Sequence, residues 1–216
     1  ILSAMTDQGS DYNEVLKEAQ ELGYAESDPT SDIEGLDAAR KLVILSSLAF
    51  NTRVTLNDIF TEGISKVSKE DIQYADELGC VIKLLAIAKN QEEGIEARVH
   101  PALLSKNHPL ATVSGVYNAI YVVGDAVGET MFYGKGAGSL PTGSAVVSDI
   151  MQIACNMESK SVGSVNSGCY RNYTIKSPDN FTTGYYIRVK VKDEPRVFAT
   201  LALFFAEAGI SFASII

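Results

Sequence analysis

The chain has 216 residues, of which 46% are apolar and 21% charged, a composition typical of a globular protein that can bury a sizeable core. Its formal net charge of −9 argues against a nucleic-acid partner, because binding a phosphate backbone needs a basic face. The apolar runs are far shorter than the ~18 residues of a membrane span and no signal peptide is visible, so we expect a cytoplasmic protein with no membrane partner.

The cysteines and histidines give no metal site. Cys80, Cys155 and Cys169 are widely spaced and odd in number, and no Cys-x-x-Cys occurs, which favours free thiols in a reducing compartment. His100 and His108 each precede a proline and have no clustered cysteines or acids beside them. We interpret both histidines as structural and predict no metal.

Two helices are predicted in the first fifty residues. Apolar residues recur with helical spacing over 11–22 and a loop follows over 24–31. A longer helix then begins near position 31 or 32 and continues to 48. Ser31 and Glu34 have the spacing of a capping box, which would fix the start of this second helix.

The next hundred residues predict strands and two further helices. A helix is expected over 69–78, followed by strands over 81–88, 95–100, 116–123 and 129–133. A glycine-rich loop over 134–141 then leads to a helix over 144–157. A linker or long surface loop is expected over 158–184. The first two strands, joined by a turn, should pair antiparallel. The fold class is therefore α+β, with a mixed sheet and helices packed on one face.

The last part of the chain has a pattern of its own. A strand over 185–191, a helix over 197–208 and a strand over 210–216 form a strand–helix–strand unit. We predict two domains, 1–180 and 181–216.

Five carboxylates fall within twelve residues, and they are Glu26, Asp28, Asp32, Glu34 and Asp37. The simplest interpretation is helix capping and favourable charge at a helix N-terminus. A calcium loop is disfavoured, because the Asp-x-Asp-x-Asp-Gly spacing is absent and a proline interrupts the run. A third interpretation is a pocket for the ammonium group of an amino-acid substrate.

Asp37 and Lys41 are one helical turn apart and therefore project from the same face. An exposed pair of this kind is worth only ~0.3–0.5 kcal/mol. The flanking residues are nearly all apolar, however, and a partnered lysine on a mostly buried helix is a candidate for general acid–base chemistry.

The glycine-rich loop from Gly134 to Ser144 joins a strand to a helix, as a phosphate-binding loop does. It matches neither G-x-G-x-x-G nor the P-loop. It is either a tight turn with Pro141 near the start of the helix or a place where backbone approaches a flat ligand closely.

Four motifs, in order, resemble homoserine dehydrogenases. They are Gly23-Tyr-Ala-Glu-x-Asp-Pro-x-x-Asp-x-x-Gly-Leu-Asp-Ala-Ala-Arg-Lys41, Tyr74-Ala75-x-Glu77-Leu78-Gly79, Val99-His100-Pro101, and Phe132-Tyr133-Gly134-x-Gly136-Ala137-Gly138-x-x-Pro141-Thr142-x-Ser144-Ala145-Val146-Val147-x-Asp149. The resemblance covers nearly all of 1–180. Residues 185–216 resemble the first half of a ferredoxin-like ACT regulatory domain, with Arg196 where a glycine is usual.

The resemblance implies an oxidoreductase of threonine and methionine biosynthesis, which interconverts L-homoserine and L-aspartate 4-semialdehyde with NADP or NAD. Lys41 matches the proton-transferring lysine, and Asp37 the acid that binds the reacting end and holds that lysine. Glu26 matches the acid that binds the substrate ammonium, with Asp32 in support.

The resemblance also implies partners and a missing part. Gly136 and Gly138 match the loop that lies against the cofactor, and the sheet is expected to form a homodimer. The family's N-terminal Rossmann domain is not in this sequence, so most of the cofactor site is expected outside it and the piece alone is expected to be inactive. An amino-acid effector such as threonine is possible. The alternative is a non-catalytic, amino-acid-sensing ACT module.

Overall fold

The computed structural model describes residues 1–22, 25–159 and 171–215. Contacts between Cα atoms divide the chain into two compact units, Ile1–Thr182 and Thr183–Ile216. We describe each unit by itself. The assignment of the two units as separate domains stays a prediction.

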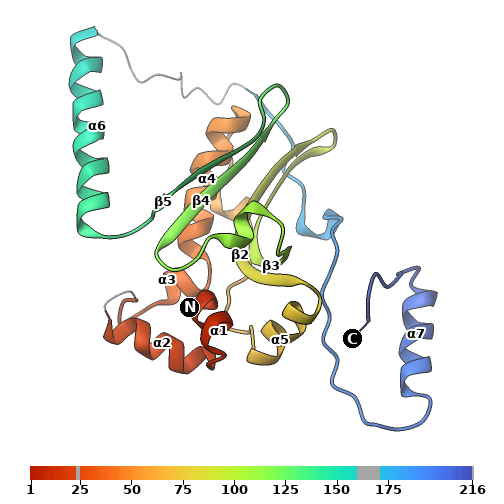
Figure 1. The fold of residues 1–216 in the computed structure, drawn as a ribbon. Helices are drawn as coiled ribbons and strands as arrows, with labels where there is room; N and C mark the ends of the chain where they lie inside the picture. Colours follow the sequence, from red (N-terminus) through yellow and green to blue (C-terminus); the bar gives the residue numbers. More distant parts are fainter. Residues whose placement is uncertain (23–24, 160–170, 216) are drawn as a thin grey trace. The chain divides into compact units, whose positions relative to one another are not determined.

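The first unit contains both helices and strands (Figure 1). Its helices are α1 (Leu2–Gln8), α2 (Tyr12–Glu21), α3 (Thr30–Ile33), α4 (Leu36–Phe50), α5 (Lys69–Glu77) and α6 (Ser139–Ser159), with short 3₁₀ turns η1 (Leu56–Asp58), η2 (Pro109–Thr112) and η3 (Pro178–Asn180). Its strands are β1 (Phe60–Thr61), β2 (Cys80–Gln91), β3 (Gly94–Ser105), β4 (Tyr117–Gly124) and β5 (Gly128–Lys135).

The strands form two sheets. The first has the order β1-β3-β2, in which β2 and β3 form a long antiparallel hairpin and β1 runs parallel to β3. The second is the antiparallel β4–β5 hairpin. The predicted α+β class with a mixed sheet is confirmed, and so is the antiparallel pairing of the first two strands.

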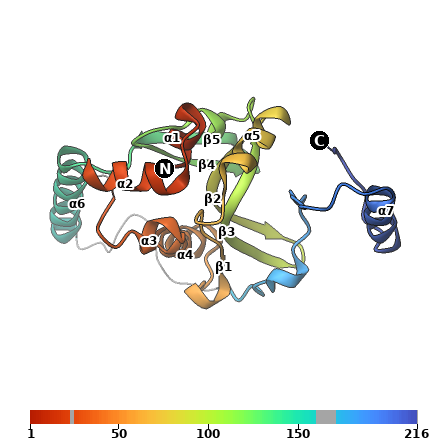
Figure 2. The ribbon, with the colours of Figure 1, turned by 90° about the horizontal axis from the view of Figure 1, so that it is seen from below.

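The helices pack on one face of the three-stranded sheet. The register places Ile82 opposite Leu103 and Ala86 opposite Val99, so Ile82 and Val99 point to the same face. Helices α1, α2 and α5 cover the Ile82 end of this face, and α4 covers the Val99 end. Figure 2 shows α3 beside α4 next to β1 and β3.

A glycine divides the helix predicted over 31–48 into two. Gly35 adopts φ +74°, so α3 ends before it and α4 begins after it. A Cβ atom at Gly35 would lie 3.0 Å from Val99 Cγ1, so this turn is pressed against β3. The predicted capping box at Ser31 and Glu34 is therefore wrong, because a close approach to the sheet sets the start of α4.

Residues 171–176 are not the linker or surface loop that their composition suggested. Ile175 pairs with Ile95 in a parallel bridge, and Arg171 pairs in the same way with Thr52. The rest of the predicted linker that precedes Arg171, from 160 to 170, lies outside the described residues. This part of the chain is thus attached to the first unit through backbone hydrogen bonds.

The second unit contains helix α7 (Val197–Glu207), as predicted. The segments 185–191 and 210–215, predicted as strands, belong to no sheet, and position 216 is outside the described residues. A β-strand is defined by its pairing with a neighbouring strand, and no sheet of the described residues includes either segment. The Phe205 and Phe212 rings meet edge to face, 4.8 Å apart, and hold the returning chain against α7.

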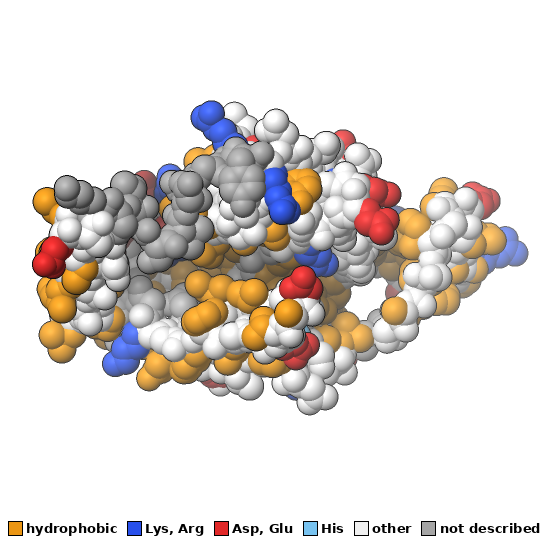
Figure 3. Space-filling model, turned by 90° about the horizontal axis from the view of Figure 1, so that it is seen from above, with side chains coloured by type: hydrophobic (Ala, Val, Ile, Leu, Met, Phe, Trp, Pro, Cys, Tyr) orange, Lys and Arg blue, Asp and Glu red, His pale blue; other side chains and the backbone are white. Residues whose placement is uncertain are grey.

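Apolar side chains are exposed on α6 and on the β4–β5 hairpin (Figure 3, where α6 is at the left edge). No described residue of α6 is buried. The large exposed apolar residues of this helix are Leu140, Val146, Val147, Ile150, Met151, Ile153 and Met157. Contiguous apolar surface of this kind usually marks an interaction face. No helix within the described ranges is long and apolar enough to cross a membrane.

Candidate active site on helix α4

Asp37 and Lys41 form an ion pair on α4. The Lys41 Nζ atom lies 2.6 Å from Asp37 Oδ2, and the two residues are one turn apart. The helix holds the ammonium and the carboxylate side by side, so one ligand can contact both groups.

The pair is exposed, as the simpler interpretation of its spacing predicted, and the apolar flanks do not bury the lysine. The Lys41 and Asp37 side chains keep 68% and 42% of their accessible surface. Helix α4 instead buries Ala39, Leu42 and Ser46 against the sheet. A pair so exposed contributes ~0–1 kcal/mol to stability, so stability alone gives little reason for it.

The same side of α4 also exposes apolar residues. Leu36, Ile44, Leu45 and Leu48 each keep at least 40% of their accessible surface. Together with Asp37 and Lys41 they make an apolar surface that carries one amine and one carboxylate. If another surface covers it, the pair lies in a dry environment, where its electrostatic interactions strengthen.

Of the acidic residues before α4, Glu26 and Asp32 are the predicted substrate-binding residues, and Asp28 has a structural role. Glu26 and Asp32 are exposed. The Asp28 Oδ1 atom accepts hydrogen bonds from the Thr30 hydroxyl at 2.6 Å and from the Thr30 backbone N–H at 3.1 Å. These bonds lower the pKa of Asp28 below its usual value. Asp28 therefore shapes the start of α3.

Glu34 lies against the backbone of Gly63 and near Tyr12. A Cβ atom added at Gly63 would lie 2.6 Å from Glu34 Oε2, so the carboxylate rests against bare backbone. The pKa of Tyr12 is raised, first by burial and then by the negative charge of Glu34. Glu34 thus faces α2 and the segment before α5.

Two contacts hold the acidic loop on α4. The Arg40 guanidinium donates from Nη1 to Ser31 Oγ at 2.9 Å. The Gly35 N–H donates to the Asp32 carbonyl at 3.2 Å, which closes the turn between α3 and α4. Asp32 and the Asp37–Lys41 pair therefore lie on one hydrogen-bonded segment, formed by α3, the turn at Gly35 and α4.

The glycine-rich loop joins β5 to α6. The Gly136 N–H donates to the Val116 carbonyl at 3.2 Å, and the Asn118 side chain occupies the space that a Cβ at Gly136 would need. Gly138 has φ +121°, which a residue with a side chain rarely adopts. Helix α6 begins at Ser139, earlier than predicted, with Pro141 in its first turn, where no backbone donor is required.

The glycine-rich loop and the Asp37–Lys41 pair are not bonded to each other within the described residues. Within the described ranges, no hydrogen bond or ion pair joins residues 134–141 to α4. Neither glycine carries a side chain of its own, but the Asn118 side chain fills the space in front of Gly136 and Pro141 lies beside Gly138.

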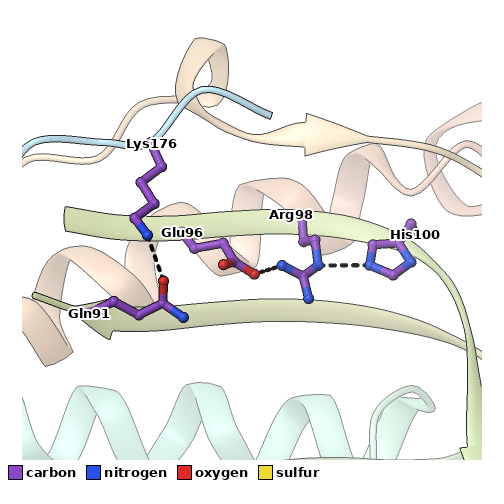
Figure 4. A network of polar contacts seen from close by, with 5 residues as sticks. All are labelled: Gln91, Glu96, Arg98, His100 and Lys176. Carbon is purple, nitrogen blue, oxygen red and sulfur yellow. Dashed lines mark hydrogen bonds and ion pairs between the residues drawn. The ribbon is translucent and has the colours of Figure 1, made fainter. Parts of the chain in front are cut away.

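A buried polar network on β3 was not predicted (Figure 4). Glu96 and Arg98 form an ion pair and keep only 2% and 4% of their accessible surface. The Arg98 Nε–H donates to His100 Nε2 at 2.9 Å, so His100 Nδ1 carries the proton and donates to the Pro101 carbonyl at 2.8 Å. The Arg98 guanidinium also lies over the Phe181 ring, 5.5 Å from its centroid.

The sequence did carry a signal for this network. Glu96, Arg98 and His100 alternate along a strand, which puts them on one face. Polar alternation normally indicates a solvent-facing side, so nothing local distinguished a buried network from an exposed one.

Comparison with known proteins decides the family. The family model described as homoserine dehydrogenase matches residues 1–151. The chain belongs to the homoserine dehydrogenase family. A homoserine dehydrogenase of Bacillus subtilis is 47% identical over 216 residues, which are 100% of this chain and 50% of that protein.

Two solved structures agree with this family. A homoserine dehydrogenase from Thiobacillus denitrificans matches with a TM-score of 0.84 and 42% identity, over 100% of this chain and 51% of that one. A hyperthermophilic archaeal homoserine dehydrogenase, described in complex with NADPH, matches with a TM-score of 0.58 and 27% identity, over 72% and 44%. The chain spans about half the length of the curated relatives it matches.

Proposed function

We propose that this chain is the substrate-binding and dimerisation region of an NAD(P)-dependent oxidoreductase that interconverts L-homoserine and L-aspartate 4-semialdehyde. The Asp37–Lys41 pair, 2.6 Å apart and open to the surface in a chain of this family, is the observation that carries the proposal. The enzyme would act in the cytoplasm, in threonine and methionine biosynthesis.

Lys41 is the proposed proton donor. When the semialdehyde is reduced, the Lys41 ammonium protonates the carbonyl oxygen, directly or through a water molecule, as hydride reaches the carbon. In the opposite direction the neutral amine accepts the hydroxyl proton of homoserine. Asp37 holds the amine in place and binds the reacting end of the substrate.

The acidic loop is the proposed site for the other end of the substrate. An amino acid carries an α-ammonium group, and a carboxylate is its natural partner. Glu26 would bind that ammonium and Asp32 would support it. Both side chains are exposed, so both can reach a ligand.

The cofactor would lie against the loop that contains Gly136 and Gly138, two residues without side chains of their own. When bound, NADP or NAD supplies or accepts the hydride. The complex of the archaeal relative with NADPH supports a nicotinamide cofactor. The two glycines suit one edge of such a ligand, and we propose that the rest of its site belongs to a nucleotide-binding region outside this sequence.

The exposed apolar surfaces support further partners. We assign α6 and the apolar surface around Lys41 to contacts with the nucleotide-binding region, and the β4–β5 hairpin to a homodimer. The second unit would be part of an ACT domain that binds an amino-acid effector such as threonine.

Replacement of Lys41 by alanine in the full-length protein tests the proposal. Homoserine-dependent reduction of NADP or NAD should fall by a factor of about 10²–10⁴, the usual contribution of a general acid–base group. The melting temperature should hardly change, because the lysine is exposed. The matched control is Lys17→Ala, which breaks the exposed Lys17–Glu21 pair on α2 and should leave turnover unchanged.

The opposite pattern would contradict the proposal. If Lys41→Ala keeps kcat within threefold of the wild type, Lys41 does not transfer the proton. If substitutions around Pro195–Val197 abolish a ligand response in a protein without turnover, the chain is an amino-acid-sensing module instead.

A further inference from the structure

Residues 171–182, called the strap from here on, connect the end of helix α4 to the second unit. The strap is the last part of the first unit, and the second unit begins at Thr183. Three sets of contacts attach it, and they fall at successive points along its length.

The first attachment is at the C-terminal end of α4. The Arg171 N–H donates to the carbonyl of Asn51, the residue that ends α4 with φ 51°. The buried Thr52 hydroxyl donates to the Arg171 carbonyl at 2.8 Å and accepts from the Tyr173 N–H at 3.3 Å. One hydroxyl thus joins the end of the helix to two residues of the strap.

The second attachment is along β3. The Ile95 N–H donates to the Thr174 carbonyl and the Lys176 N–H donates to the Ile95 carbonyl, both at 2.8 Å. Gly94 has φ +131°, and a Cβ atom there would collide with the Thr174 carbonyl. Ile175 packs against the cluster that contains Ala39 and Leu42 of α4. The strap therefore touches α4 through its core as well as through its end.

The third attachment is nearest to the second unit. The Lys176 ammonium donates to Gln91 Oε1 at 2.8 Å and to Glu93 Oε2 at 2.9 Å, and Figure 4 shows it reaching Gln91 across the hairpin. The hydrogen bond from Lys176 lowers the pKa of Glu93. Farther along, the Phe181 ring lies under the Arg98 guanidinium.

We propose that the strap positions helix α4, with Thr52 as the positioning residue, and that the placement of the Asp37–Lys41 pair on this helix depends on the strap. The consequence for turnover rests on the proposed function, whereas the coupling of strap and helix does not. The physical basis is that the strap is bonded to the cap of α4 and that Ile175 packs against the cluster that contains Ala39 and Leu42 of this helix.

The test is hydrogen exchange on the full-length protein with Thr52→Val, which keeps the shape of the side chain and removes the hydroxyl. Amide exchange should become about tenfold faster in 171–176 and also in the last turn of α4, the factor for loss of about one net hydrogen bond. The kcat for homoserine oxidation should fall about tenfold, because the Asp37–Lys41 pair is misplaced.

Two variants control the result. Thr52→Ser restores the hydroxyl and should restore wild-type exchange and kcat. Thr112→Val removes a hydroxyl that bonds only locally, to the Pro109 carbonyl, and should change neither. If Thr52→Val does not fold, Lys176→Met, which releases the strap at its third attachment, takes its place in the same comparison.

Faster exchange confined to 171–176, with α4 unchanged, would overturn the proposal. So would equal effects of Thr52→Val and Thr112→Val, or a fall in kcat that Thr52→Ser does not reverse. A wild-type protein without homoserine oxidation would defeat the proposed function alone, because the exchange measurement does not depend on activity.

Discussion

Replacement of Arg98 by alanine should destabilise the protein more than any change to its exposed ion pairs. The substitution leaves the Glu96 carboxylate, whose side chain is 3% exposed, without its cationic partner. Breaking a buried pair by removing one partner costs about 3–5 kcal/mol, because a charge stays buried without compensation. The loss of the guanidinium over Phe181 adds to this cost.

The assay is urea unfolding of the full-length protein, supported by thermal melting. The melting temperature should fall in parallel with the free energy of unfolding. The matched control is Lys106→Ala, which removes the Lys106–Asp76 pair of 2.6 Å, with side chains 48% and 66% exposed. That change should cost only about 0–1 kcal/mol.

A double substitution separates charge from packing. Glu96→Leu with Arg98→Met removes both charges and keeps apolar volume, so it should recover most of the stability that Arg98→Ala loses. If Arg98→Ala costs no more than Lys106→Ala, the argument from burial is refuted.

Three further changes have defined outcomes. Gly63→Ala should lower the free energy of unfolding by about 1–3 kcal/mol in urea, because its Cβ would collide with the Ile33 carbonyl; an unchanged midpoint would contradict this contact. Arg196→Gly should slow amide exchange in α7, corresponding to about 1–2 kcal/mol, because Arg196 adopts φ 77°; equal exchange would show that the backbone bears no strain. Thr30→Val should raise the pKa of Asp28 towards its ordinary 3.8 in an NMR titration, and an unmoved titration would rule out Thr30 as the cause. Because the pKa of Asp28 is lowered in the folded protein, the stability it adds is present above that ordinary value and disappears as the pH falls through the lowered one.

Local pattern was sufficient for several elements. The helical period places Asp37 and Lys41 on one face wherever α4 lies, and their 2.6 Å contact follows from that spacing. A nearly continuous apolar run, a short turn and an alternating segment were sufficient to predict the β2–β3 hairpin. The apolar run of α7 was sufficient to predict its helix.

The side of α4 that faces the core could not be predicted in this way. Apolar residues flank Asp37 and Lys41 on both sides in sequence, so the pattern left both an exposed and a buried pair open. The sheet instead covers Ala39 and Leu42, and the lysine points out. The choice depends on Val99 and Ala97, which are distant in sequence.

Thus the sequence by itself determined which residues share a helix face or a strand face, because those relations involve only a few consecutive residues. Only the tertiary structure decided what covers each face. It buried Glu96 and Arg98, pressed Gly35 against Val99, and attached the strap to the end of α4. Burial and strand pairing come from contacts between distant segments, and no local pattern encodes which segments will meet.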